Sequence, residues 1–416
     1  MVGNYRGITY AMLISLIVDE WNVFLIPQTN LFVSSYFHLN SLSFGFVTGI
    51  VFAGAAIGSL IGGYFTDKFG RKLIFQVDML VFIVAALVSV FSPNFMWFIG
   101  SRLVAGIAVG ADIANVYAYI METSKIGDRE YTGSLNTLMA SISILSINFV
   151  VLYMLTRGGP TSYIWKYPLI ISAIPAAVGL SYSFKLKETT LWKKISSNTV
   201  EKKKISNLFI NSLKRKTTLF TWVSGAASTI EIGTFAFFIP FIIGKLGISS
   251  PEIQRMIIIL VYSFGIPAGY LGPVLLPRLG LRGLSYSGYI ITSVSLVLSG
   301  LFLIEGEYLL VPFSMFMFVW GNHWNSQPIL TSQALVSDTE FRGRSVGITN
   351  FISELPAFLS ITFFPSLVDS FKLGPSTLLI TLAPLAGLIT AIFVFKEVYG
   401  YKEDLAILGT ATVEFA

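Results

Sequence analysis

Apolar residues form twelve long runs, separated by short polar stretches, along this chain of 416 residues. Each run is long enough for a helix that crosses the hydrocarbon core of a bilayer, which requires about 20 residues. The runs lie near residues 10–33, 44–66, 73–92, 95–121, 132–156, 163–184, 218–244, 252–276, 284–304, 308–336, 342–366 and 375–396. The pattern predicts an all-α integral membrane protein with twelve transmembrane helices.

The chain also contains a weak internal repeat. The segment DREYTGS at 128–134 is similar to DTEFRGR at 338–344, and DKFGRK at 67–72 is similar to PRLGLR at 277–282. Such a repeat predicts two pseudo-symmetric six-helix halves. We expect the following parts: a first half at 1–184, a basic cytoplasmic linker at 185–217, a second half at 218–398 and a cytoplasmic tail at 399–416.

Composition agrees with a membrane protein, since 54% of the residues are hydrophobic and 12% are charged. The chain has no cysteine, and its two histidines, His38 and His323, are too few to build a metal site unaided. We therefore expect no metal and no cofactor. The first apolar run contains Asp19 and Glu20 and lacks a cleavage site, so no removable signal peptide is expected.

Basic residues gather on one side of the predicted membrane. The segment from Lys185 to Lys216 holds ten bases and two acids, and its place between two spans is typical of a cytoplasmic loop near anionic lipid rather than of a nucleic-acid site. All but six of the 28 Lys and Arg residues lie on the side of the termini; the exceptions are Arg102, Arg157, Lys166, Lys245, Arg255 and Lys372. The positive-inside rule then predicts a multi-pass protein of the plasma membrane with both termini in the cytoplasm.

The loop GGYFTDKFGRK at 62–72 lies between the second and third predicted spans. It resembles the corresponding loop of the major facilitator superfamily, and the matching positions are Gly63, Asp67, Lys68, Phe69, Gly70, Arg71 and Lys72. Asp67 lies at the carboxyl end of a helix, where the helix dipole disfavours it, so it needs a partner such as Arg71 or the amino end of another helix. The resemblance implies a latch that closes one of two transport states.

Further charged positions at the same face are candidates for this latch. Glu122 and Arg129 have the Glu-x6-Arg spacing of sugar porters, and Asp338 and Arg342 are expected to take the corresponding role in the second half. Glu188 and Glu397 follow the sixth and twelfth spans, as in the same porters. Asp78 is assigned to the latch region as well.

The fourth span resembles the metabolite:proton and phosphate:proton symporter branch of the family. Gly106, Gly110, Asp112 and Glu122 match that branch, whereas the Tyr-Pro that follows in phosphate transporters is missing. In the first span, DEWN at 19–22 resembles related symporters. The resemblance implies a proton-coupled transporter of a metabolite.

Five acidic residues lie near the expected bilayer midplane, roughly 15 Å from the cytoplasmic surface at 1.5 Å per residue. These proton-coupling candidates are Asp19, Glu20, Asp112, Glu231 and Glu354. Asp19 and Glu20 are adjacent and about 100° apart on a helix, so only one of them is expected to face inward. Charge at that depth is costly, so such residues normally face a cavity or a partner and carry function; the alternative is a protonated acid that joins helices. No base is expected beside them, because Arg102 is placed near the outer face.

The tenth span carries a polar and aromatic patch, WGNHWN at 320–325. Its side chains could stack on and hydrogen-bond a small solute, or instead pack against a neighbouring helix. The candidates for substrate binding are Trp320, Asn322, His323, Trp324 and Asn325 in this patch, with Trp21, Asn22, Asn148 and Gln327 elsewhere.

These patterns favour a proton-coupled secondary transporter that works by alternating access, with symport preferred. No phosphate-binding loop for ATP and no constellation for an enzyme is present in the sequence. Two alternatives stay open: an organic-cation or drug/proton antiporter, and a transporter-like solute sensor without net flux. We expect a monomer whose partners are a small-molecule substrate, protons and membrane lipid, with no nucleic acid.

Overall fold

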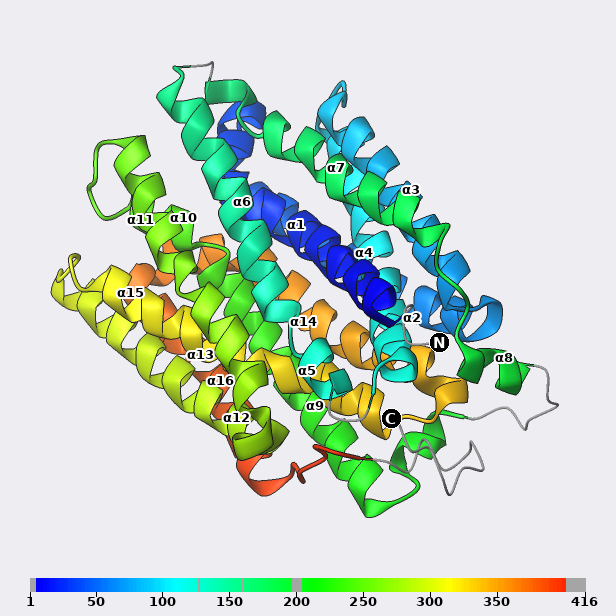
Figure 1. Ribbon diagram of the computed structural model, residues 1–416. Coiled ribbons are helices and arrows are strands. Elements are labelled where there is room, and N and C mark those ends of the chain that lie inside the picture. Colours follow the sequence, from blue (N-terminus) through cyan, green and yellow to red (C-terminus); the bar gives the residue numbers. More distant parts are fainter. Residues whose placement is uncertain (1–4, 126–127, 159–160, 197–203, 402–416) are drawn as a thin grey trace.

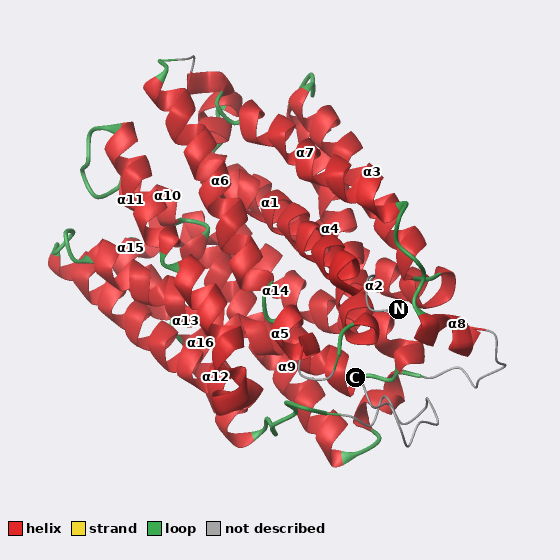
Figure 2. Ribbon diagram, in the orientation of Figure 1, coloured by secondary structure: helices red, strands yellow, loops and turns green. Residues whose placement is uncertain are grey.

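The computed structural model describes residues 5–125, 128–158, 161–196 and 204–401. Every regular element in these ranges is a helix (Figure 2). The prediction of an all-α membrane fold is confirmed. Residues 197–203 of the expected linker and residues 402–416 of the expected tail lie outside the described residues.

The first half contains six crossings. They are α1 (Tyr5–Phe37), α2 (Ser41–Phe69), α3 (Arg71–Val90), α4 (Phe95–Thr123), a fifth crossing made of α5 (Asp128–Gly133) and α6 (Asn136–Thr156), and α7 (Lys166–Ser183). Asparagine side chains fix two of the starts, because Asn40 accepts a hydrogen bond from the Ser43 amide at 2.8 Å and Asn94 accepts one from the Trp97 amide at 3.1 Å. Each thus caps the amino end of an apolar run.

The second half contains six further crossings. Its helices are α9 (Ser212–Glu231), the π-helical turn η4 (Ile232–Ala236), α10 (Ile239–Gly244), α11 (Pro251–Ser263), α12 (Gly265–Glu305), α13 (Val311–Val336), α14 (Arg342–Phe371), α15 (Leu373–Ile380) and α16 (Leu382–Phe393). Short helices connect the halves or the spans: η2 (Thr161–Tyr163), α8 (Thr190–Ser196), η3 (Ile205–Phe209) and η5 (Thr339–Phe341). α9 begins at Ser212, within the segment predicted as linker.

α12 comprises the end of one crossing and the whole of the next. Gly280 breaks it with φ 67° and ψ 175°, a conformation that side-chain-bearing residues rarely adopt. Nine helical segments of the described residues are long and apolar enough to span a membrane, and one of these, Pro251–Glu305, contains two crossings. α7 and α13 complete the twelve, although α13 is made less apolar by its polar patch.

The helices form two groups that pack side by side (Figure 1). α2 lies along α14, and α6 lies along α11 and α12; these are major contacts between the groups. By the sequence repeat, α2 corresponds to α11 with the start of α12, and α6 corresponds to α14. The two interfaces are therefore equivalent under the pseudo-symmetry of the halves.

Candidate functional site

A cavity lies between the two halves, and helices α1, α4, α6, α9, α13 and α14 contribute to its wall. The volume of the cavity is about 120 Å³. The polar residues that line it are Asp19, Glu20, Tyr117, Asn136, Ser228, Thr229, Ser326, Asn350, Ser353 and Glu354. Three of the five predicted midplane acids thus face one cavity, namely Asp19, Glu20 and Glu354. The expectation that only one of Asp19 and Glu20 faces inward is wrong, since both line it.

Asp112 does not line this cavity but lies directly behind it. Its carboxylate accepts a hydrogen bond from the Ser15 hydroxyl of α1, and it is close enough to Asp19 and to Asp78 of α3 for electrostatic interaction. All three carboxyl groups are at least nine-tenths buried. Asp19 therefore connects the cavity with a cluster of acids inside the first half. The assignment of Asp78 to the latch region is wrong, because its side chain joins this cluster.

Glu231 lies within the second half, on α9 and outside the cavity lining. Its Oε2 accepts hydrogen bonds from the amides of Asn325 at 2.9 Å and Asn322 at 3.2 Å on α13. The π-helical turn η4 follows it directly, and such turns often occur at functional positions. Two amides thus hold this acid against a neighbouring helix.

The polar patch on α13 makes packing contacts instead of lining the cavity. The ring of His323 lies 2.6 Å from the Ser141 hydroxyl of α6, and Gln327 donates to Thr137 of α6 at 2.8 Å, so both residues join the halves. The Trp324 indole donates to the Ala268 carbonyl at 3.1 Å and packs on Trp320. Of the two roles considered for the patch, the contacts of its residues match packing against neighbouring helices, and none of residues 320–325 lines the cavity.

The remaining predicted substrate residues also contact protein. Trp21 donates to the Pro168 carbonyl at 3.0 Å. Asn22 accepts two hydrogen bonds from the Arg102 guanidinium, at 2.6 Å to its backbone carbonyl and at 3.3 Å to its side-chain oxygen. The Arg102 side chain is buried against α1, one turn beyond Asp19, so a base lies closer to the midplane acids than the sequence predicts.

Asn148 belongs to a polar network between the halves on the side opposite the 62–72 loop, which we call the far face. Arg255 of α11 donates to the Asn148 side chain at 2.5 Å and to the Gln28 carbonyl at 3.1 Å. The Gln28 amide in turn donates to the Tyr262 hydroxyl at 3.1 Å. These contacts hold α1 and α6 against α11.

Asp67, which the sequence predicts to act as a latch, contacts the second half, and we call this side of the molecule the latch face. The Asp67 carboxylate at the end of α2 accepts hydrogen bonds from the backbone amides of Gly343 and Arg344, both at 3.0 Å, and from the Arg344 side chain at 3.1 Å. These amides are at the free amino end of α14, where a negative charge is favoured. Arg71 is further away, at 3.7 Å. Asp67 thus joins the two halves.

Arg71 and Glu122 form a buried pair beside Asp67, with 2.6 Å between the guanidinium and the carboxylate. Arg342 from the second half approaches the same carboxylate at 3.5 Å. Glu122 therefore pairs with these two arginines, although Arg129 is the base that follows it at the Glu-x6-Arg spacing. Arg129 donates instead to the Tyr401 carbonyl.

Two glutamates occupy equivalent places in the two halves. Glu188 accepts hydrogen bonds from the first amides of α3, those of Arg71 and Lys72, next to Gly70 with its φ of 96°. Glu397 accepts the same bonds from Leu281 and Arg282, next to Gly280. The sequence repeat thus has a structural counterpart, because in each half a glutamate caps the amino end of an equivalent helix. Asp338 at this face pairs with Lys214 at 2.8 Å.

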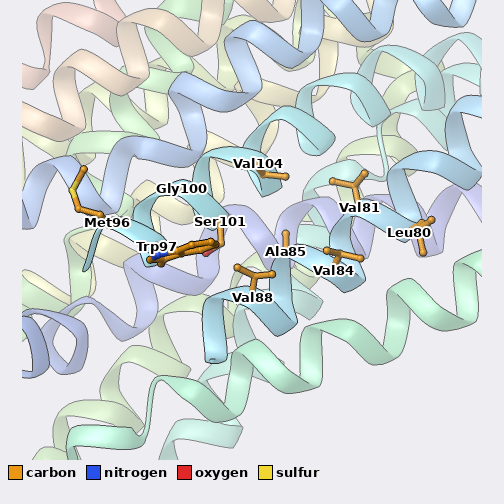
Figure 3. A pocket seen from close by; sticks show the side chains of 10 residues that line it. All are labelled: Leu80, Val81, Val84, Ala85, Val88, Met96, Trp97, Gly100, Ser101 and Val104. Atoms are coloured by element: carbon orange, nitrogen blue, oxygen red, sulfur yellow. The ribbon is translucent and has the colours of Figure 1, made fainter. Parts of the chain in front are cut away.

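A second hollow, on the outer surface of α3 and α4, is almost entirely apolar (Figure 3). Leu80, Val84, Met96 and Trp97 line it and are each at least half exposed. Exposed aliphatic and aromatic side chains suit the lipid-facing side of a membrane helix. Among its lining residues only the Ser101 hydroxyl and the Trp97 indole N–H are polar side-chain groups, so we do not assign this hollow to the site.

Several residues of the cavity were missed by sequence reasoning. Ser228, Thr229 and Ser353 are of types that occur throughout membrane helices, so nothing in the sequence distinguishes them. Asn350 could have been found, because it precedes Glu354 by four residues and therefore shares its helix face. Trp192 of α8 was also missed; its indole donates to the Asp67 carbonyl at 2.9 Å and supports the latch.

Twelve crossings in two related halves, with a polar cavity between them and polar contacts that join them at each face, are the architecture of membrane transporters built from two repeats. A family model described as the Major Facilitator Superfamily matches residues 10–361. The chain belongs to the Major Facilitator Superfamily.

Among curated relatives, the probable metabolite transport protein CsbC of Bacillus subtilis is 29% identical over 43% of this chain and 38% of its own length. The D-xylose transporter of Levilactobacillus brevis is 36% identical over 36% of this chain and 32% of its own length. The glucose transporter GlcP of Staphylococcus epidermidis is 31% identical over 39% of this chain and 35% of its own length. The matches thus span about a third of the length of these relatives.

The fold is similar to that of the proton:xylose symporter XylE bound to 6-bromo-6-deoxy-D-glucose, with a TM-score of 0.81 and 18% identity over 97% of this chain and 98% of the other. The inward-open conformation of the xylose transporter XylE from E. coli gives a TM-score of 0.71 at 18% identity, over 97% and 99% of the two chains. The likeness extends over both halves.

Proposed function

We propose that this protein is a proton-coupled symporter of a small hydroxylated solute that works by alternating access. The observation that carries the proposal is the cavity between the halves, in which Asp19 connects the solute space with the buried Asp112. Hydroxyl and amide groups in the same wall provide donors and acceptors for a hydroxylated solute. Relatives named as transporters of D-xylose and glucose support this class of substrate.

Alternating access needs contacts between the halves that can break at each face in turn. At the latch face, Asp67 holds the amino end of α14; at the far face, Arg255 holds α1 and α6. Both sets of contacts are present together in this structure. Breaking one set while the other persists would open the cavity to one side of the membrane only.

Proton coupling is assigned to the acids behind the cavity. A buried carboxylate is costly, and protonation removes most of that cost. A neutral Asp112 therefore permits the first half to close, whereas an ionised Asp112 favours a state in which water reaches it. We infer that the latch face is cytoplasmic, because the basic linker and most Lys and Arg residues lie on that side. We also infer a location in the plasma membrane.

Transport in proteoliposomes tests this function. With an acidic exterior, radiolabelled D-xylose or D-glucose should accumulate inside above its external concentration, and a protonophore should abolish the accumulation. Protein-free liposomes are the control. Exchange without accumulation would contradict proton coupling, and binding without any flux would favour a solute sensor.

The acidic wall favours one second candidate, an organic-cation/proton antiporter. Asp19, Glu20 and Glu354 line the cavity, and none of the described lining residues is Lys, Arg or His. An antiporter would move solute against the proton flow. An imposed acidic exterior would then drive solute out of preloaded vesicles instead of into them.

A further inference from the structure

Glu20 and Glu354 face the same cavity from opposite halves of the molecule. Glu20 is on α1 and Glu354 is on α14, and the two carboxyl groups are close enough to interact electrostatically. Glu354 is 7% exposed, and its Oε2 has no hydrogen-bond partner among the described residues. Two acids with this placement can contact one solute together when the halves close.

The bases buried nearby are used elsewhere. Arg102 donates to Asn22, and Arg255 donates to Asn148 and to the Gln28 carbonyl. Both guanidinium groups thus bind amide groups instead of the cavity acids. No base among the described residues therefore offsets the acids of the cavity wall, and an ionised carboxylate there needs a cation to offset the loss of its hydration.

We propose that the cavity selects a protonated amino group, carried on a small hydroxylated solute, and holds it between Glu20 and Glu354. This inference rests on the proposed function and adds a cationic group to the solute. Asn136, Thr229 and Asn350 lie in the same wall and can bond the hydroxyl groups of the solute. The acids of the proton site, Asp112 and Asp78, lie behind the cavity and are not required for this contact.

An organic cation fits this wall better than a metal ion. A metal ion needs several oxygen or nitrogen ligands directly around it, at about 2.0–2.6 Å. No group of three or more Asp, Glu, His or Cys residues in the described parts of the chain is placed to hold one. An ammonium group, by contrast, donates three hydrogen bonds and is satisfied by two carboxylates and a hydroxyl oxygen.

The amine also has a consequence for closure. Two ionised carboxylates that approach from opposite halves repel each other and oppose closure. An ammonium group between them replaces that repulsion with two attractions. Bound solute therefore favours the closed state, through which a loaded carrier must pass between its two open states.

The test compares D-glucosamine, D-glucose and N-acetyl-D-glucosamine, of which the first alone carries a charged amine. Binding to the purified full-length protein is measured by calorimetry at a pH at which the amine is protonated. We expect D-glucosamine to bind about tenfold more tightly than D-glucose, a difference equal to one charge-assisted contact. Glu354→Gln should remove most of this preference, and the exposed Glu307→Gln should keep it.

Melting temperatures of both variants show whether they fold, and Glu20→Gln replaces Glu354→Gln if the latter does not. Equal binding of the three sugars, with pH-driven uptake of D-glucose intact, overturns the inference and leaves the proposed symport standing. A preference for D-glucosamine that Glu354→Gln and Glu20→Gln both retain also overturns the inference. No binding of any sugar and no uptake overturn the proposed function together with the inference.

Discussion

Asp67 shows how one carboxylate can join two halves of a membrane protein and still release them. At the end of its own helix it meets an unfavourable dipole, and at the start of α14 it meets a favourable one. Its bonds to the Gly343 and Arg344 amides therefore exist only while the halves are in contact. The sequence predicted that this residue needs such a partner, but it did not show which helix provides it.

Replacing Asp67 tests this contact. Asp67→Asn keeps the size of the side chain but loses the charge, and hydrogen bonds to charged groups contribute about 1.5–3 kcal/mol each. We expect the state open at the latch face to become about tenfold more populated. The chain has no cysteine, so Thr229→Cys in the cavity can report access of an impermeant reagent from that face. Unchanged labelling would remove Asp67 from the latch, and the exposed Asp369→Asn is the control.

Trp324 illustrates a residue whose environment changes its expected role. Its indole is bonded to the Ala268 carbonyl and packs on Trp320, outside the cavity. Trp324→Ala should lower the free energy of unfolding by about 3 kcal/mol, the lower end of the range for lost aromatic side chains, because this side chain is only partly buried. Solute affinity in calorimetry should change less than threefold. A tenfold loss of affinity at unchanged melting temperature would return this residue to the binding site.

Charged residues in apolar runs were found from the sequence because the cost of burying them makes them stand out. Asp19, Glu20 and Glu354 were predicted in this way and do line the cavity. The sequence could not show that Asp19 lies in the cavity wall whereas Asp112 lies behind it. The difference depends on the rotation of α4 about its axis, which packing against α1 and α3 sets.

At the scale of elements, all twelve crossings follow from hydrophobic run length. The sequence could not show that α2 lies along α14, because contacts between distant helices leave no local signal. It also gave no sign of the π-helical turn after Glu231. The close approach of α2 and α14 depends on glycine: an added Cβ on Gly45 would lie 2.2 Å from the Thr362 carbonyl, and one on Gly347 would lie 2.2 Å from the Ser59 carbonyl.

These two glycines should act in opposite directions. Gly45→Val prevents the contact of α2 with α14 toward the far face, and Gly347→Val prevents it toward the latch face. We therefore expect the Thr229→Cys reporter to be labelled more strongly from the far face in the first variant and from the latch face in the second. Gly100→Val is the control, since nothing lies within 4 Å of its added Cβ. Labelling from the same face in both variants would contradict rocking of α2 against α14.

At the scale of the whole molecule, the halves are related in sequence but differ in charge. Both halves cap a helix with a glutamate, Glu188 or Glu397, at a glycine of positive φ. Only the first half carries the latch aspartate, because Pro277 stands at the equivalent position. The cluster of Asp19, Asp78 and Asp112 is likewise in the first half. The proton binding that we propose for the first half would therefore be transmitted to the second half through the contacts between them.

Asp112→Asn separates proton coupling from transport itself. The amide imitates the protonated carboxyl group permanently, keeps its size and can still accept the bond from Ser15. Closure of the first half then no longer requires a proton. We expect the variant to lose accumulation driven by a pH gradient, by at least about tenfold, and to retain exchange of solute between the two sides, since exchange needs no release of the proton.

Both activities are assayed in proteoliposomes at equal protein content, with the parent protein and Asp369→Asn as controls. Loss of accumulation with retained exchange assigns the coupling proton to Asp112. Loss of both, with an unchanged melting temperature, places Asp112 in solute transfer. Accumulation at the parent rate removes Asp112 from the mechanism. The coupling role then passes to Asp19, whose carboxyl group is the member of the cluster that reaches the cavity, or to Glu20, Glu354 or Glu231.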